Sequence, residues 1–267
     1  MSLRFCTLDP ATLFNFLSLL PNVRDLDIAY SSPYPSSLDT VPDVPEVIPS
    51  FGGTLSLAGL NSGHLILKVV AALPLHFTTI IIRQCAFREP EAYQMLFTTC
   101  RDTLVILRFD EGYRGALEVS LGHPTCPYSP TNPDRPVPDV SLASCNRLEE
   151  VHALLSSNRK VARSIVNLLS SITSQVLRKI SFSSIKFVNE WDSDSEDSDE
   201  DDWSNEEDGA ETWNSLDTTL SHLAKEVSRA GGRLTLRFNI WRLDSAERAK
   251  FDCLLSQFLE YGTLDIS

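Results

Sequence analysis

Short stretches with apolar residues at their first, fourth and sixth places recur along this 267-residue chain. Five copies are clear: VRDLDIA from Val23, FTTIIIR from Phe77, LVILRFD from Leu104, LEEVHAL from Leu148 and LRKISFS from Leu177. Three looser copies keep the last two apolar places: GGTLSLA from Gly52, GGRLTLR from Gly231 and YGTLDIS from Tyr261. The alternation predicts a short β-strand in each copy, with its fourth and sixth residues facing a core.

The spacing of the copies indicates a repeat interrupted by insertions. Their fourth residues are Leu26, Leu55, Ile80, Leu107, Val151, Ile180, Leu234 and Leu264. Successive fourth residues are 25 to 30 positions apart, except for two gaps of 44 and 54 positions. These gaps contain a proline-rich segment, 123–138, and an acidic segment, 190–211, without which the period is about 25 to 32 residues. A third insertion, 31–50, carries five prolines and is expected to be coil.

Helical patterns fill most gaps between the predicted strands. Helices are expected to start at Pro10 and Pro90, because proline suits the first helical position. Further helices are expected at 63–73, 159–171, 215–229 and 244–262, the last with a capping box formed by Asp244 and Glu247. Strands that alternate with helices run parallel, since each crossover returns the chain to the same end. We therefore predict one α/β solenoid domain over residues 1–267.

The LxxLxL spacing, with an amphipathic helix before most copies, resembles the leucine-rich-repeat region of F-box proteins. The likeness is greatest to the divergent family abundant in mushroom-forming fungi, in the stretch LLSSITSQVLRKISF. The resemblance implies a leucine-rich-repeat-like solenoid, with parallel strands on its concave face and helices on its convex face. It also implies a non-enzymatic module that recruits substrates to a ubiquitin ligase. No F-box is recognisable before the first repeat, so a Skp1-type adaptor is expected to bind only through an F-box outside this chain.

The third, fifth and seventh residues of each strand should point away from the helices and line the concave face. The candidate partner-binding residues at these positions are Arg83, Arg108, Glu150, His152, Lys179 and Arg233. An alternative interpretation is that these charges only solvate an exposed sheet face.

All three insertions follow a strand, so they should border one rim of that face. Prolines at every third place of 123–138 suit a polyproline II helix, as a stiff spacer or as a ligand for an aromatic groove.

The segment 190–211 has thirteen acidic residues and no Lys or Arg, which predicts disorder. Three interpretations stay open. The segment is a solvated loop, a lid in cis over Lys179, Arg233 and Arg237, or a binder of basic proteins such as histones. The last would make the chain an acidic chaperone, similar to the acidic leucine-rich nuclear phosphoproteins. Three serines in a casein-kinase-2-like context are phosphorylation candidates: Ser193, Ser198 and Ser204.

Charge and motifs argue against several functional classes. The net charge is −13, but the chain outside 190–211 has equal numbers of acidic and basic residues, so nucleic-acid binding is not expected. The six cysteines form no CxxC pair, and no catalytic motif, metal-ligand spacing or cofactor signature is found. No apolar stretch is long enough to cross a membrane. We expect an intracellular monomer, cytoplasmic or nuclear, without cofactors, metal ions or catalytic residues.

Overall fold

A computed structural model describes thirteen ranges of the chain: 2–4, 7–8, 10–18, 24–29, 32–33, 51–58, 64–73, 75–83, 90–110, 140–155, 159–184, 206–239 and 245–266. The chain divides into two compact units, Met1–Leu148 and Glu149–Ser267. Most of insertion 31–50, all of 123–138 and residues 190–205 lie outside the described ranges. The prediction of one domain over 1–267 stays a prediction.

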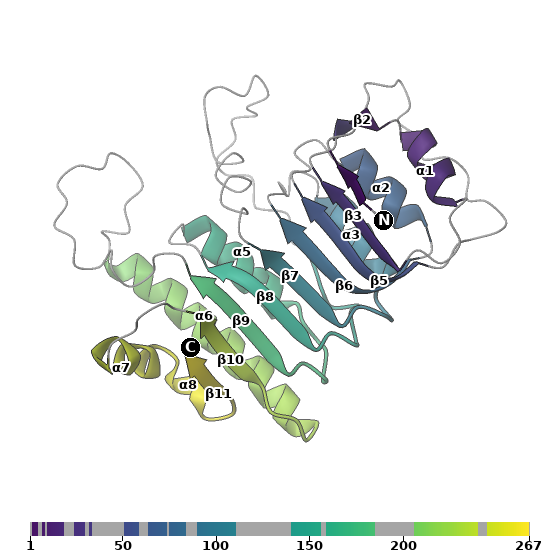
Figure 1. Cartoon of the computed structure of the whole chain (residues 1–267). Coiled ribbons are helices and arrows are strands. Elements are labelled where there is room, and N and C mark those ends of the chain that lie inside the picture. Colours follow the sequence, from purple (N-terminus) through teal and green to yellow (C-terminus); the bar gives the residue numbers. More distant parts are fainter. Residues whose placement is uncertain are drawn as a thin grey trace, which may run out of the picture. The chain divides into compact units, whose positions relative to one another are not determined.

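The first unit is an α/β layer with a parallel sheet. Its strands are, in the order in which they pair, β1 (Ser2–Arg4), β3 (Asp25–Ala29), β5 (Phe51–Ala58), β6 (Leu75–Arg83) and β7 (Ile106–Asp110). Helices α1 (Pro10–Ser18), α2 (His64–Ala72) and α3 (Pro90–Thr99) lie on one side of this sheet (Figure 1). Strands β2 (Thr7–Leu8) and β4 (Ser32–Pro33) form a separate parallel pair.

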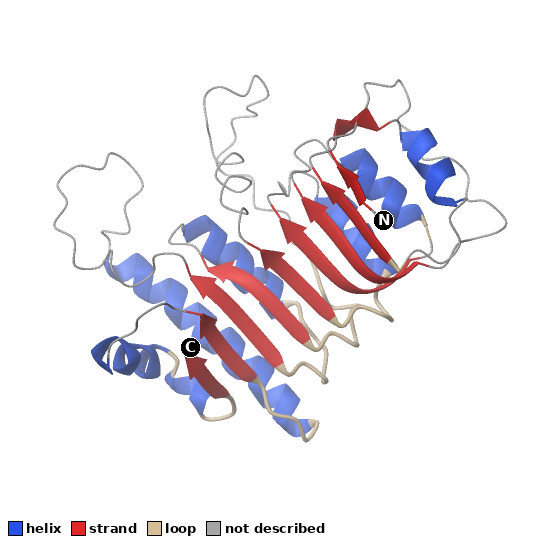
Figure 2. Cartoon of the chain, viewed as in Figure 1, coloured by secondary structure: helices blue, strands red, loops and turns tan. Residues whose placement is uncertain are grey.

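The second unit repeats this arrangement. Its parallel strands are β8 (Glu150–Leu155), β9 (Lys179–Ser184), β10 (Thr235–Asn239) and β11 (Thr263–Ile266). Its helices are α5 (Arg159–Ser170), α6 (Glu206–Arg229), α7 (Ser245–Leu254) and α8 (Ser256–Leu259). Figure 2 shows the strands in red with the blue helices α5 and α6 behind them. The predicted α/β class with parallel strands is confirmed.

The register of the strands confirms most of the predicted repeat alignment. In the first unit Leu26, Leu55, Ile80 and Leu107 lie side by side on neighbouring strands. In the second unit Val151 pairs with Ile180 in the same way. All of these side chains are buried at the helix-covered side of the strands. Burial of such apolar rows contributes about 25 cal/mol per Å² and is the main force that holds the layers together.

The predicted alignment is wrong by two residues in the copy that starts at Gly231. Leu236, not Leu234, pairs with Ile180 on one side and with Leu264 on the other. Gly231 has φ +81, a left-handed conformation that glycine adopts without strain, and it ends α6 in a tight turn. Leu234 is fully buried in the segment that leads from this turn into β10. It therefore precedes the strand, as Leu148 and Leu177 precede theirs.

The helices begin where proline predicts, at Pro10 and Pro90, and α2 and α5 match their predicted ranges within a residue. Helix α6 begins at Glu206, nine residues before its predicted start, so residues 206–211 of the acidic segment are helical rather than disordered. Acidic residues are favourable at a helix N-terminus, because the helix dipole is positive there. The predicted C-terminal helix is divided at Leu255 into α7 and α8. Strands β1, β2 and β4 were missed because two or three residues show no periodicity.

Aromatic side chains join the sheet of the second unit to its helices. The ring of Phe182 on β9 lies 5.3 Å from that of Phe238 on β10, and Phe238 lies 4.9 Å from Phe251 on α7. The indole of Trp213 on α6 meets Phe251 edge to face at 5.9 Å. These contacts define the helix side of the sheet, since Phe182 and Phe238 point toward it. Residues that alternate with them must point to the opposite face.

Asp217 of α6 acts as the N-cap of a different helix. Its side chain is 3% exposed, and its two carboxylate oxygens accept the backbone N–H groups of Gln257 at 3.1 Å and Phe258 at 2.9 Å. These are N–H groups of the first turn of α8, for which the helix itself has no acceptor. The residue at the N-cap position, Leu255, has no side chain that could accept them. The carboxylate thus fixes α8 to α6.

Two cysteines of the first unit are buried thiols. Burial raises the pKa of Cys100 to about 12 and that of Cys145 to about 11, because the core disfavours the thiolate. The Cys145 thiol donates to the carbonyl oxygen of Phe97 at 3.7 Å. Cys253 of α7 is exposed, and all three cysteines are free.

We expect Asp217→Asn to lower the free energy of unfolding by about 1 to 3 kcal/mol, since the amide cannot accept both hydrogen bonds and loses the charge. The measurement is urea denaturation followed by circular dichroism. The matched control is Asp252→Asn, an exposed acid of α7 with no partner among the described residues. Equal midpoints for the two variants would contradict the capping role.

The buried thiols predict a loss of stability at alkaline pH. Above pH 9, the ordinary thiol pKa, the unfolded chain ionises Cys100 and Cys145, whereas the folded chain keeps them protonated up to about 11 or 12. The stabilisation is present below pH 9 and is lost as pH rises, at about 1.4 kcal/mol per thiol and pH unit. Urea denaturation at pH 8 and pH 10 should show a smaller loss for Cys145→Ala than for the parent chain. The control variant Cys253→Ala, at an exposed site, should lose as much stability between pH 8 and pH 10 as the parent chain. If Cys145→Ala also loses as much as the parent chain, the buried thiol is not the cause of the alkaline loss.

Candidate binding surface

The sheet of the second unit has one face that no described helix or strand covers, and we call it the open face (Figure 1). Its side chains form two rows across the four strands. The first row is Glu150, Lys179, Thr235 and Thr263. The second row is His152, Ser181, Arg237 and Asp265. Each row is set by the register that aligns the buried apolar residues on the helix side.

Most side chains at the two flanks of the open face bind one another. On β8, Nε2 of His152 lies 3.2 Å from a carboxylate oxygen of Glu150. On β10 and β11, Nε of Arg237 lies 3.6 Å from a carboxylate oxygen of Asp265. The hydroxyls of Thr235 and Thr263 lie 3.2 Å apart. The flanks are therefore largely satisfied within the chain.

The centre of the open face differs from its flanks. Strand β9 presents Lys179 and Ser181 there, two residues apart and hence on the same side. The ammonium of Lys179 has no ion pair or hydrogen bond with any described residue. The hydroxyl of Ser181 is buried, its residue 2% exposed, and it too has no partner in the described part of the chain. A cation without an ion pair and a buried hydroxyl without a hydrogen bond thus lie on neighbouring outward positions of β9, between paired side chains.

The structure distributes the six predicted partner-binding residues over three places. Glu150, His152 and Lys179 come together on the open face of the second unit. Arg83 and Arg108 are exposed on neighbouring strands of the first unit, where Arg108 pairs in register with Ile81. Arg233 is exposed in the turn before β10 and is not in line with Lys179, because Thr235 occupies that position. The expectation that Arg233 belongs to the strand face is corrected.

Sequence analysis missed two residues of the open face, Thr263 and Asp265. Their signal was the alternation in the last copy, YGTLDIS, which places them opposite the buried face. The alternation also put Ser181 and Arg237 on the outward side; Arg237 was named only as one of the basic residues under a lid in cis, and nothing singled out Ser181. The phosphorylation candidates Ser193, Ser198 and Ser204 lie outside the described residues.

The register places Ser181 beside His152, which is itself held by Glu150, and this order of residue types resembles a nucleophile, a base and an orienting acid. The first link is missing, because the Ser181 hydroxyl makes no hydrogen bond to the imidazole. Such a bond is the geometric requirement for an activated serine. Among the described residues no group of three His, Cys, Asp or Glu side chains could hold a metal ion.

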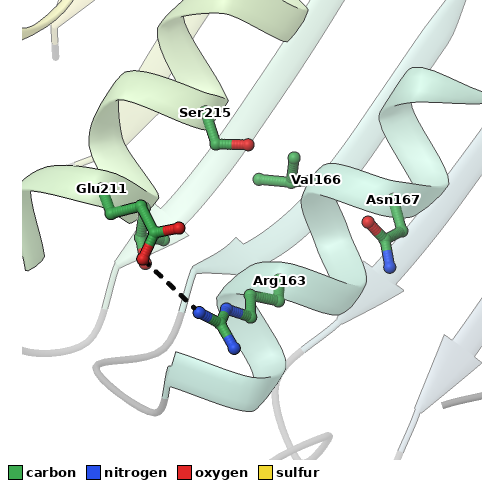
Figure 3. A pocket seen from close by; sticks show the side chains of 6 residues that line it. Arg163, Val166, Asn167, Glu211 and Ser215 are labelled. Carbon is green, nitrogen blue, oxygen red and sulfur yellow. Dashed lines mark ion pairs between the residues drawn. The ribbon is translucent and has the colours of Figure 1, made fainter. Parts of the chain in front are cut away.

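A small cavity lies between α5 and α6, with a volume of about 60 Å³. Figure 3 shows Arg163 and Glu211 across its mouth, joined by an ion pair of 3.7 Å. Both side chains are more than half exposed, so this pair contributes little to stability. Pockets for small molecules measure roughly 300 to 1,000 Å³, so this cavity has room for little more than water.

Comparison with protein-family models, with curated proteins and with solved structures finds no match for this chain. None of the described helices is long and apolar enough to cross a membrane.

The register of the open face can be tested by cross-linking. Neighbouring strands lie about 4.8 Å apart, which suits a disulfide between residues in direct register. We expect Lys179→Cys with Thr235→Cys to form a disulfide under mild oxidation, detected by mass spectrometry of unreduced peptides. The pair Lys179→Cys with Arg233→Cys should do so far less, since a shift of two residues separates the α-carbons by roughly 8 Å. Preferential cross-linking of the second pair would overturn the register.

Proposed function

We propose that this chain is a non-enzymatic protein-binding module that binds its partner through the open face of the second unit. The observation that carries the proposal is the contrast between the two faces of that sheet. One face is buried under helices, while the other presents charged and hydroxyl side chains, of which Lys179 and Ser181 have no partner among the described residues. A buried hydroxyl without an acceptor, beside a cation without an ion pair, favours binding of a group that accepts hydrogen bonds.

The shape of the surface favours a protein over a small molecule. The open face is a broad strand surface, and the cavity between α5 and α6 is far smaller than a ligand site. A protein segment can contact several strands at once and exclude water from the polar centre. Charge complementarity favours an acidic segment, because the centre presents the unpaired ammonium of Lys179.

The proposal includes the finer assignment that the resemblance implies, a leucine-rich-repeat-like solenoid of the F-box type that recruits substrates. It is supported by the repeat period of about 25 to 32 residues and by the equivalent registers within each unit. In that role the open face would select the substrate. A Skp1-type adaptor would be bound through an F-box outside this chain.

The test uses full-length chain with Lys179→Glu and Arg237→Glu together. We expect this variant to lose the partner, since both strands then repel an acidic segment. The matched control is Arg248→Glu with Lys250→Glu, which reverses two exposed charges on α7. Proteins captured by the parent chain are purified, and each is then tested with the control and with the open-face variant. Direct titration should then show a loss in affinity of about tenfold or more.

Two outcomes decide against this proposal. If both double variants lose or keep the same purified partner, the open face is not the binding surface. If deletion of 190–205 abolishes binding of histones while the open-face variant binds them normally, the chain is instead an acidic chaperone of basic proteins. Thermal melting of each variant checks that the fold is kept.

A further inference from the structure

We propose that Lys179 and Ser181 together form the seat for one carboxylate of the partner, so that the open face recognises an extended acidic protein segment. This inference rests on the proposed function and names the chemical group that the open face binds. It starts from Ser181, whose hydroxyl is buried at the centre of a polar face and has no partner among the described residues. A buried hydroxyl without a partner is unfavourable, and an alanine at the same place would avoid this cost.

The direction of both side chains follows from the strand. Ile180 and Phe182 are fully buried on the helix side, and Phe182 contacts Phe238 in that layer. Lys179 and Ser181 alternate with them and point to the open face. The charged donor of Lys179 and the neutral donor of Ser181 therefore belong to the same face, two residues apart on one strand.

A carboxylate matches these donors. It carries one negative charge and two oxygens that only accept hydrogen bonds, so one oxygen can take the ammonium and the other the hydroxyl. A phosphate, which carries about two charges near neutral pH, would be repelled by the carboxylate of Glu150, the neighbour of Lys179 in register. One cation without a partner among the described residues, next to an acidic side chain, suits a single negative charge.

The side chains beside Ser181 control access to its hydroxyl. His152 and Arg237 neighbour Ser181 in register on either side. The ion pair of Arg237 with Asp265 spans 3.6 Å between side chains that are 38% and 51% exposed, so it is weak and exchangeable. A rotation of the Arg237 side chain as the partner binds would admit the carboxylate to Ser181.

The experiment measures fluorescence anisotropy of labelled peptides with the full-length chain. The probes are a short peptide of alternating glutamate and glycine, its glutamine counterpart and its phosphoserine counterpart. We expect the glutamate peptide to bind best, with the glutamine peptide weaker by about tenfold, because a neutral amide gains no charge-assisted hydrogen bond. Repulsion from Glu150 and Asp265 should also lower the affinity for the phosphoserine peptide.

The variants separate the two donors. Lys179→Gln should lower the affinity for the glutamate peptide by about tenfold, and Ser181→Ala should lower it by about threefold. The double variant should lose less than the product of the two, since both groups hold one carboxylate. Matched controls are Lys250→Gln, an exposed lysine of α7, and Ser183→Ala, the next outward serine of β9; neither should change the affinity. Ser181→Ala should melt at the same temperature or higher, which a structural role for the hydroxyl would not allow.

Several results would overturn the seat. They are equal binding of the glutamate and glutamine peptides, tighter binding of the phosphoserine peptide, no effect of Ser181→Ala, or fully multiplicative losses in the double variant. If one of these results is found but Lys179→Glu with Arg237→Glu still abolishes binding of the purified partner, only the carboxylate seat is rejected and the open face remains the binding surface. If the double variant also binds the purified partner normally, the proposed function is rejected as well.

Discussion

Lateral alignment of buried apolar residues is the constraint on which both units depend. A strand has a side-chain period of two, so a shift by one residue would carry Ile180 and Phe182 to the open face and Lys179 and Ser181 into the helix layer. Burying an unpaired ammonium there is strongly unfavourable. The strand register that buries the apolar side chains therefore also determines which polar residues lie side by side in the two rows of the second unit. The surface is a consequence of the packing behind it.

The repeat pattern predicted the strands and most of their register because these depend on local alternation and burial. All eight predicted strands are present, and Leu26, Leu55, Ile80 and Leu107 align as expected. The copy near Gly231 shows where the pattern is ambiguous. Leu234 and Leu236 have the same parity, so a shift by two keeps every side chain on its face, and alternation alone fits either register. The turn at Gly231 decides, and it moves Arg233 out of the strand.

The candidate site was predictable only as a set of outward positions. Alternation placed Glu150, His152 and Lys179 on one face, and the structure agrees. Which of them bind one another is decided by rotamers and distances that a sequence pattern does not contain. The pairing of His152 with Glu150, and the lack of a partner for Lys179 among the described residues, are properties of the folded surface. The same limit applies to Asp217, whose partners lie on a separate helix.

The open face combines satisfied flanks with an unsatisfied centre, and this contrast bears on how it would discriminate. Side chains that already bind one another have fewer groups left for a partner, so they contribute shape and repulsion more than attraction. The attractive part is confined to β9, where the cost of the unpaired Ser181 hydroxyl is already present in the free chain. A partner that supplies the missing acceptor removes that cost as it binds, whereas a partner without one leaves it in place. Acidic neighbours such as Glu150 then oppose a more highly charged ligand, so selection would come from the number of charges as well as from their sign.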